Sequence, residues 1–281
     1  MKFSKLMNDQ VQNLGLKAIN LMARGSSYRL QQHRYGKDDR HQYDCYLHND
    51  QIDNRPNIIF LYGGNWRSGA RADYRFVADT LCLQGFNVYI PDYRLYPHVR
   101  FFEILEDVRT AINSIMDNIK PGPIFIMGHS AGAQIGALMA LDTRLLNDVQ
   151  RISGFIGLAG PYDFYPFTED AHWDLFSPEE QYPNSQPVNF VRADAPPLYL
   201  LHGEDDNRVR RGHSKSLMEK QREVGGHAQR EVYSKQGHVD ILLSLTRLQR
   251  QKSKVLKDIR QFILDHSMQD EINELAQGHI L

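Results

Sequence analysis

The sequence has little cysteine, no long apolar run and no excess of charge of either sign. Only two of its 281 residues are cysteines, Cys45 and Cys82. That number favours two reduced core thiols over a disulfide framework. No apolar run reaches the roughly 18 residues of a membrane span, so we expect no membrane partner. The formal net charge of −1 argues against a nucleic-acid partner, which requires a basic surface.

Targeting and cofactor motifs are missing as well. The first residues are basic, but Asn8, Asp9 and Gln10 interrupt any apolar signal core, so no secretory signal is predicted. The sequence has no zinc-type spacing of histidine and cysteine, no P-loop and no dinucleotide fingerprint. We therefore expect a cytoplasmic protein with no metal and no organic cofactor. Its oligomeric state is left open.

We interpret residues 1–281 as one domain, because strand-like and helix-like segments alternate through most of the chain. Residues 1–30 are expected to be a helical segment that either packs on the body or covers the mouth of a site. Residues 161–195 break the alternation with many proline, acidic and aromatic residues. They predict an insertion that forms a partial lid.

Short apolar runs bounded by glycine or proline predict strands, and apolar residues at helical spacing predict helices. The expected strands are 43–47, 58–62, 86–90, 124–127, 152–158, 198–201 and 230–233. The expected helices are 74–83, 101–119, 131–141, 214–222 and 255–264. This alternation predicts an α/β fold with a mostly parallel sheet and helices on both faces. In such folds functional groups gather at the carboxyl ends of the strands.

The segment Gly128-His129-Ser130-Ala131-Gly132 stands between an apolar strand and an alanine-rich helix. This setting is typical of a nucleophile elbow, in which serine occupies a sharp turn and larger side chains at the flanking glycines would clash. The sequence therefore predicts Ser130 as a nucleophile. The alternative is an idle serine in a glycine-rich turn.

His238 follows the last expected strand and is the predicted base for Ser130. His227 is a rival, but it precedes that strand and would lie at the opposite end of the sheet. A carboxylate after the strand 198–201 would orient the base. Asp206 gives the order nucleophile, acid, base that is expected for this architecture. Glu204 and Asp205 compete with it on the residues alone.

The segment Tyr62-Gly63-Gly64-Asn65-Trp66 follows another expected strand. Its glycines would let backbone N–H groups approach a ligand, and together with the N–H of Ala131 they would form an oxyanion hole. Trp66 and the insertion's aromatic residues either line an acyl or aryl pocket or pack the core of the insertion. His129 and Tyr162 are further pocket candidates, although His129 also fits a packing role.

These segments, together with Pro91–Pro97 and His202-Gly203-x-x-Asp206-x-x-Val209, resemble the α/β-hydrolase superfamily. Within it they are similar to the carboxylesterases and arylformamidases with an HGG-W oxyanion motif. The resemblance covers about residues 43–265. It implies a central sheet of about eight strands, a Ser130–Asp206–His238 triad and oxyanion donors at Gly64, Asn65 and Ala131.

Two positions depart from that pattern. Tyr62 stands where the motif has histidine, which puts the bracing of the loop in question. Asn65 stands where glycine or a small residue is usual; its backbone N–H can still serve as a donor, and its side chain would either narrow the pocket or add a polar contact. The expected function is hydrolysis of small carboxylic esters through an acyl-enzyme. The alternatives are hydrolysis of an aryl formamide such as N-formylkynurenine, and a non-catalytic binding protein on a hydrolase fold.

Overall fold

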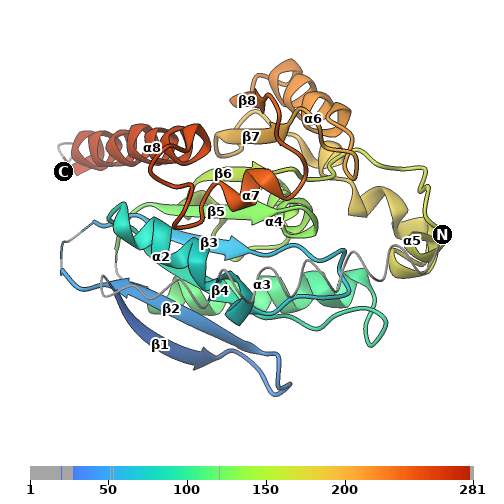
Figure 1. The fold of residues 1–281 in the computed structure, drawn as a ribbon, viewed down its shortest axis with the longest axis horizontal. Helices are drawn as coiled ribbons and strands as arrows, with labels where there is room; N and C mark the ends of the chain where they lie inside the picture. Colours follow the sequence, from blue (N-terminus) through green and yellow to red (C-terminus); the bar gives the residue numbers. More distant parts are fainter. Residues whose placement is uncertain (1–19, 21–27, 51, 53, 120, 279–281) are drawn as a thin grey trace.

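The computed structural model describes residues 20, 28–50, 52, 54–119 and 121–278. Eight strands form one sheet in the order β1-β2-β4-β3-β5-β6-β7-β8 (Figure 1). Their bounds are β1 Tyr28–Arg34, β2 Gln42–His48, β3 Asn57–Leu61, β4 Asn87–Pro91, β5 Ile124–His129, β6 Ile152–Leu158, β7 Leu198–Gly203 and β8 Ala228–Tyr233. The strands from β4 to β8 pair in parallel, while β2 pairs antiparallel with both β1 and β4.

The α-helices of the described residues are α2 Arg75–Leu83, α3 Phe101–Asn118, α4 Ala131–Leu141, α5 Asp170–Leu175, α6 Gly212–Glu223, α7 Asp240–Leu243 and α8 Lys254–Gly278. Short 3-10 helices are η1 Arg71–Tyr74, η2 Val149–Arg151, η3 Glu179–Ser185 and η4 Pro187–Phe190. The strands and helices expected between residues 43 and 264 are all present, with ends shifted by a few residues. The exception is α8, which continues well beyond the expected end at residue 264.

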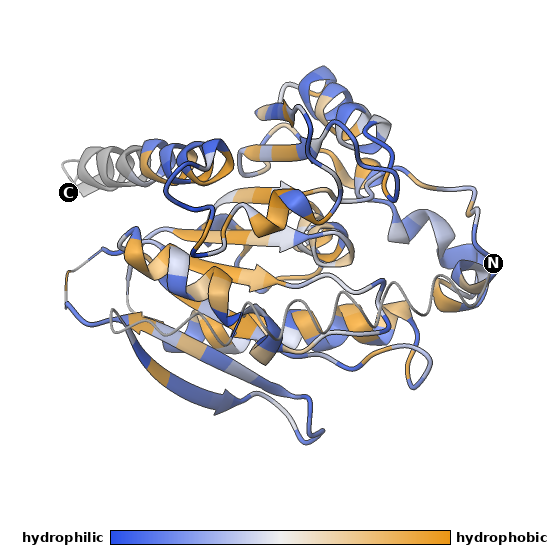
Figure 2. Ribbon diagram, in the orientation of Figure 1, coloured by the Kyte–Doolittle hydropathy of each residue, from blue (hydrophilic) through white to orange (hydrophobic). Residues whose placement is uncertain are grey.

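Helices α4 and α8 cover opposite faces of the sheet centre. A Cβ on Gly136 of α4 would meet Ile126, whereas Phe262 of α8 packs against Phe125. Neighbouring residues of a strand point to opposite faces, so the two helices lie on either side of β5. Every residue of β5 is buried, as expected for a central parallel strand, and the apolar colouring of the inner strands follows this pattern (Figure 2).

The prediction that residues 1–30 form a helical segment needs a correction. Residues 28–30 belong to strand β1 rather than to a helical segment. After Tyr28 this edge strand is exposed on both faces, so its sequence lacks the alternation that reveals a strand. Residues 1–19 and 21–27 lie outside the described residues. Asn20 is helical and hydrogen bonds to Ala72 O (2.8 Å) and Phe76 N (3.0 Å).

The predicted insertion at 161–195 lies between β6 and β7 and carries α5, η3 and η4. It sits at the side of the sheet to which the arrowhead of β3 points (Figure 1). Gln134 of α4 donates to the backbone oxygen of Ser185 (2.6 Å), which fastens the insertion to the helix after the elbow. Cys45 and Cys82 are both free and buried. No helix of the described residues is long and apolar enough to cross a membrane.

Candidate active site

Ser130 occupies a strained turn between β5 and α4. Its φ of 53° and ψ of −121° lie outside the regions that a serine ordinarily adopts. The Ser130 N–H donates to Leu158 O (2.9 Å), which holds the turn to the end of β6. The turn stands at the amino end of α4, where the helix dipole favours negative charge.

The two glycines of the elbow have no room for a side chain. A Cβ on Gly128 would collide with the backbone of Gly132, and a Cβ on Gly132 would collide with the carbonyl oxygens of Leu61 and Tyr62. Gly132 therefore lets α4 approach the end of β3. The strand, the elbow and the oxyanion loop meet at this point.

Ser130, His238 and Asp206 form one chain of hydrogen bonds. The Ser130 hydroxyl donates to His238 Nε2 (2.9 Å), and His238 Nδ1 donates to Asp206 Oδ2 (2.8 Å). The three residues follow β5, β8 and β7, so the parallel sheet brings together side chains that are 108 and 32 positions apart. His238 is 7% exposed and the Asp206 side chain is fully buried.

Asp206 accepts more hydrogen bonds than the sequence predicted. Its Oδ1 accepts the backbone N–H groups of Arg208 and Val209, each at 2.9 Å. Its Oδ2 accepts His202 Nε2 (3.1 Å) in addition to His238. Burial alone would raise the pKa of Asp206, but the hydrogen bonds from the two histidines outweigh it and hold that pKa well below its usual value. The carboxylate is thus ionised beside His238.

The structure separates Asp206 from the competing acids. Glu204 and Asp205 are exposed, whereas Asp206 faces His238. His227 is exposed and precedes β8, away from Ser130. His202 has a contact that the sequence reasoning missed, although the signal was present in the His202-Gly203-x-x-Asp206 spacing.

The loop after β3 lies directly against Ser130. A Cβ on Gly63 would be 3.1 Å from the Ser130 Cβ. Gly64 and Asn65 both have positive φ, 138° and 53°. Among the described residues, neither their N–H groups nor that of Ala131 donates to a protein acceptor. The predicted oxyanion donors are therefore free to bind an oxygen atom.

Tyr62 braces this loop through its ring and its hydroxyl. The ring is buried and stacks between Tyr74 (centroids 5.3 Å apart) and Tyr93 (4.7 Å). The Tyr62 hydroxyl donates to Asp92 Oδ1 (2.8 Å) and accepts from Arg40 Nη2 (2.9 Å). A buried tyrosine thus supports the loop at the position where the resembling motif has histidine.

His129 supports the backbone of the predicted base. Its Nε2 donates to the carbonyl oxygen of His238 (3.0 Å), and the two rings lie 5.0 Å apart. Burial and the nearby His238 lower the pKa of His129 to about 3, so its ring is neutral. At 5% exposure, it presents almost no surface to a ligand.

Two pocket predictions require correction. Tyr162 is completely buried, and it packs against Phe155 of the interior strand β6 and beside Gly157 and Gly160. Trp66 is 4% exposed, and its ring contacts aromatic side chains of the insertion: Phe164, His172 and Phe176. Its Nε1 donates to Gln134 Oε1 (3.1 Å). Trp66 therefore packs in the aromatic core of the insertion, and Tyr162 packs against β6, so neither ring is open to a pocket.

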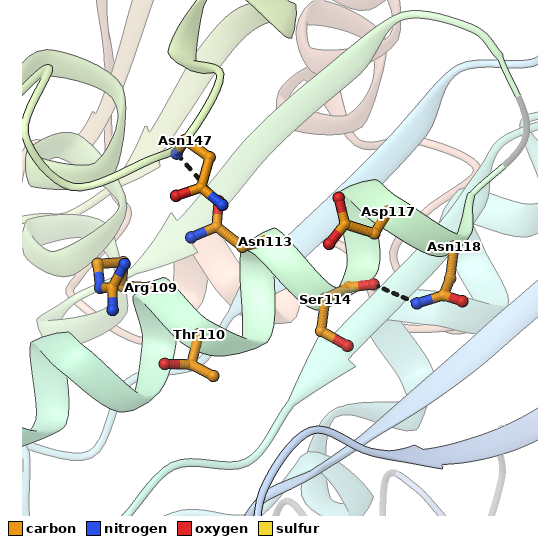
Figure 3. Close-up of a pocket in the computed structure, with 7 residues that line it drawn as sticks. All are labelled: Arg109, Thr110, Asn113, Ser114, Asp117, Asn118 and Asn147. Carbon is orange, nitrogen blue, oxygen red and sulfur yellow. Dashed lines mark hydrogen bonds between the residues drawn. The ribbon is translucent and has the colours of Figure 1, made fainter.

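A polar cleft of about 340 Å³ lies on α3, away from these residues (Figure 3). Within it, Asn147 N donates to Asn113 Oδ1 (3.1 Å) and Asn118 Nδ2 to Ser114 O (2.7 Å). None of the predicted site residues lines it. No group of three or more metal-ligating side chains that could hold an ion occurs in the part of the chain that the structure describes.

The BD-FAE family model matches residues 43–221. The isoprenylcysteine alpha-carbonyl methylesterase ICME of Arabidopsis thaliana is 27% identical over 240 residues, which cover 74% of this chain and 56% of that protein. A kynurenine formamidase of Meyerozyma guilliermondii is 28% identical over 169 residues, which cover 56% of this chain and 64% of that protein. The chain spans about half the length of the methylesterase relatives it matches.

Among solved structures, esterase B from Lactobacillus rhamnosis superposes with a TM-score of 0.75. The match covers 96% of this chain and 98% of that one at 16% identity, so the likeness shows the fold alone. The family model, in contrast, spans well over half of the chain and includes the elbow, the oxyanion loop and Asp206. The chain belongs to the BD-FAE family and has the α/β-hydrolase fold.

Proposed function

We propose that the protein is a serine hydrolase that cleaves small carboxylic esters through an acyl-enzyme, with Ser130, His238 and Asp206 as its triad. The observation that carries this proposal is the unbroken chain of hydrogen bonds from Ser130 through His238 to Asp206, at 2.9 and 2.8 Å. A nucleophile, a base and an orienting acid in this order are what acyl transfer requires. The methylesterase among the relatives supports the same class of reaction.

In the first half-reaction, Ser130 Oγ attacks the ester carbonyl carbon while its proton passes to His238 Nε2. The carbonyl oxygen becomes an anion, which the N–H groups of Gly64, Asn65 and Ala131 stabilise. One such donor typically contributes about 3–4 kcal/mol to the transition state. His238 then protonates the leaving alcohol, and the acyl group stays on Ser130.

In the second half-reaction, His238 accepts a proton from water as that water attacks the acyl carbon. The bond to Ser130 Oγ breaks, the proton returns to Ser130 and the carboxylic acid leaves. The Asp206 carboxylate stabilises the positively charged His238 in both halves and fixes the nitrogen that carries its proton. The hydrogen bond from His129 to the His238 carbonyl holds the base in place.

An aryl formamide is the second candidate substrate. The kynurenine formamidase relative supports it, and the same triad would protonate an aryl amine as the leaving group. The ester and formamide hypotheses differ in substrate and share the same catalytic residues, so one assay distinguishes them.

The test measures hydrolysis of 4-nitrophenyl esters from acetate to decanoate, and of N-formylkynurenine, by the wild type, Ser130→Ala and the control Ser267→Ala. We expect the wild type and Ser267→Ala to hydrolyse a short ester, and Ser130→Ala to lose at least about a thousandfold in kcat. A fluorophosphonate probe should add its mass to Ser130 alone.

Each outcome has a distinct meaning. A preference for N-formylkynurenine by orders of magnitude would replace the ester with the formamide. Unchanged hydrolysis by a folded Ser130→Ala would overturn the triad. A folded wild type that neither hydrolyses any substrate nor reacts with the probe would favour a binding protein.

A further inference from the structure

A second cleft, of about 530 Å³, opens between three loops. The loops are the β1–β2 hairpin, the segment after β3 and the segment after β4. Its lining includes Asp38, Arg40, Arg67, Arg94, Tyr96 and His98. Because β2 runs antiparallel to β4, the hairpin before β2 lies at the carboxyl end of β4. All three loops therefore stand at the edge of the sheet that carries Ser130.

The topology also sets how far apart the strand ends that carry the cleft and Ser130 lie. The central strands run in the order β4-β3-β5, so the loop after β4 is two strand spacings from the elbow, or about 10 Å. Arg67 N donates to Gly64 O (3.0 Å), which places Arg67 one turn beyond the predicted oxyanion donors. Tyr96 N donates to Trp66 O (2.9 Å) and joins the two loops.

Arg67 differs from the arginines around it. Each of the others has a carboxylate partner: Arg40 with Asp92, Arg71 with Asp44 and Asp92, Arg94 with Asp107, and Arg100 with Asp174. Within the described residues, Arg67 has no such partner. Its guanidinium lies over the ring of Tyr96, 4.7 Å from the centroid. This cation–π contact restrains the guanidinium, and among the described residues no carboxylate occupies its N–H groups, which suit a planar anion.

We propose that this cleft binds a carboxylate on the substrate, at the end remote from the ester, with Arg67 as its ligand. This inference rests on the hydrolase function proposed above and narrows its substrate to half-esters of dicarboxylic acids. Because the ends of β4 and β5 lie about 10 Å apart, we choose a substrate with a spacer of several carbons between the two carbonyl groups. Arg40 and Arg94 already have carboxylate partners, so among the arginines that line the cleft Arg67 is the one available to the anion in the described residues.

Asp38 is the acidic residue of the lining, and its Oδ1 accepts the N–H of Arg40 (2.9 Å). Its side chain is exposed, so its charge opposes entry of an anion. Asp38→Asn should therefore strengthen the preference for the carboxylate, while Arg67→Gln should weaken it. The two substitutions in this cleft should thus change the preference for the carboxylate in opposite directions. Loss of folding would not produce such a pair of effects.

The experiment compares mono-4-nitrophenyl suberate with 4-nitrophenyl octanoate, which has the same chain length and lacks the carboxylate. We expect the ratio of kcat/KM for the suberate to that for the octanoate to fall roughly tenfold in Arg67→Gln. At high salt this difference between the wild type and Arg67→Gln should become smaller, because salt screens the charge of Arg67. Arg260→Gln removes an exposed arginine of α8 and should leave the ratio unchanged. Equal loss on both esters in Arg67→Gln, or no effect on either, would overturn the proposal.

Calorimetric titration of monomethyl suberate into the Ser130→Ala variant measures binding without hydrolysis. It therefore tests the carboxylate site separately from the hydrolase function. Binding that Arg67→Gln abolishes would support the carboxylate site even in a protein that hydrolyses nothing. Absence of binding to Ser130→Ala would overturn it even in an active esterase.

Discussion

At the scale of single residues, Asp206 Oδ2 accepts hydrogen bonds from two histidines. His202 Nε2 is 3.1 Å from this oxygen and 3.0 Å from Val209 O. Both partners are acceptors, so the proton of His202 resides on Nε2. His202 is fully buried and donates to the buried Asp206 carboxylate. It is therefore a positioning residue. Its hydrogen bond also stabilises the negative charge of Asp206, which weakens the effect of that charge on His238.

His202→Phe removes this donor while keeping a ring of similar size. We expect kcat/KM to fall roughly tenfold, because a hydrogen bond to a charged group typically contributes about 1.5–3 kcal/mol. The carboxylate would then act more strongly on protonated His238, so the acid limb of the pH–rate profile should move to higher pH. His202→Gln, which retains a donor, should restore much of the activity and the profile. If the pH–rate profile of His202→Phe did not shift, His202 would have only a packing role.

The lowered pKa of His129 leads us to expect that the stability of the protein depends on pH. Its pKa is lowered to about 3 in the folded protein, mainly by burial, while an unfolded histidine titrates near 6.5. Between these values the unfolded chain binds a proton that the folded protein does not. The free energy of unfolding should therefore fall as the pH drops below about 6.5, with this contribution levelling off near pH 3.

His129→Gln keeps a donor for the His238 carbonyl but has no proton to take up. Urea unfolding at intervals from pH 7 to pH 4 should show a shallower loss of stability, by up to about 1.4 kcal/mol per pH unit. Parallel curves for the wild type and the variant would contradict the assignment of a neutral, buried His129.

At the scale of elements, the close approach of α4 to β3 depends on Gly132. We expect Gly132→Ala to destabilise the fold by about 3 kcal/mol or more and to abolish hydrolysis, because the new Cβ meets carbonyl oxygens that cannot move independently. Gly212→Ala is a matched control at the start of α6, where a Cβ has nothing within 4 Å. It should be neutral or slightly stabilising. Similar denaturant midpoints for the two variants would disprove the steric account.

The elements differ in how clearly their sequences reveal them. Helix α4 begins at Ala131 and ends at Leu141 as predicted, because its alanine-rich sequence is bounded by the elbow and a turn. Strand β1 was missed because its exposed edge position imposes no apolar alternation. Sequence patterns reveal an element where one or both faces are buried, and this is the case for the inner strands.

At the scale of the whole molecule, a buried charge network joins the β1–β2 hairpin to the loops after β3 and β4. Arg71 Nη1 is 2.5 Å from Asp92 Oδ2, and Arg71 Nε is 2.8 Å from Asp44 Oδ1. Asp92 also accepts the Tyr62 hydroxyl. The network therefore connects these three segments beside the glycine loop that follows β3.

Asp92→Asn should destabilise the protein by about 3–5 kcal/mol, because Arg40 loses its carboxylate partner and Arg71, at 15% exposure, keeps only Asp44. Asp174→Asn breaks the pair between Asp174 and Arg100, whose side chains are both about half exposed, and should leave the denaturant midpoint almost unchanged. Chemical unfolding of both variants tests the contrast. A small effect of Asp92→Asn would mean that water replaces the lost charge.

The sequence by itself determined the alternation of strands and helices, the elbow at Ser130 and the positions of His238 and the glycine loop after expected strands. These features depend on residues close together in the chain, so periodicity and glycine placement are enough to reveal them. The tertiary structure decided that Asp206 faces His238 while its neighbours face solvent. It also decided that Tyr62 braces the loop, that Trp66 and Tyr162 are buried, and that Arg67 has no carboxylate partner among the described residues. Each of these depends on contacts between distant segments, and the pairing order of the strands sets which segments meet.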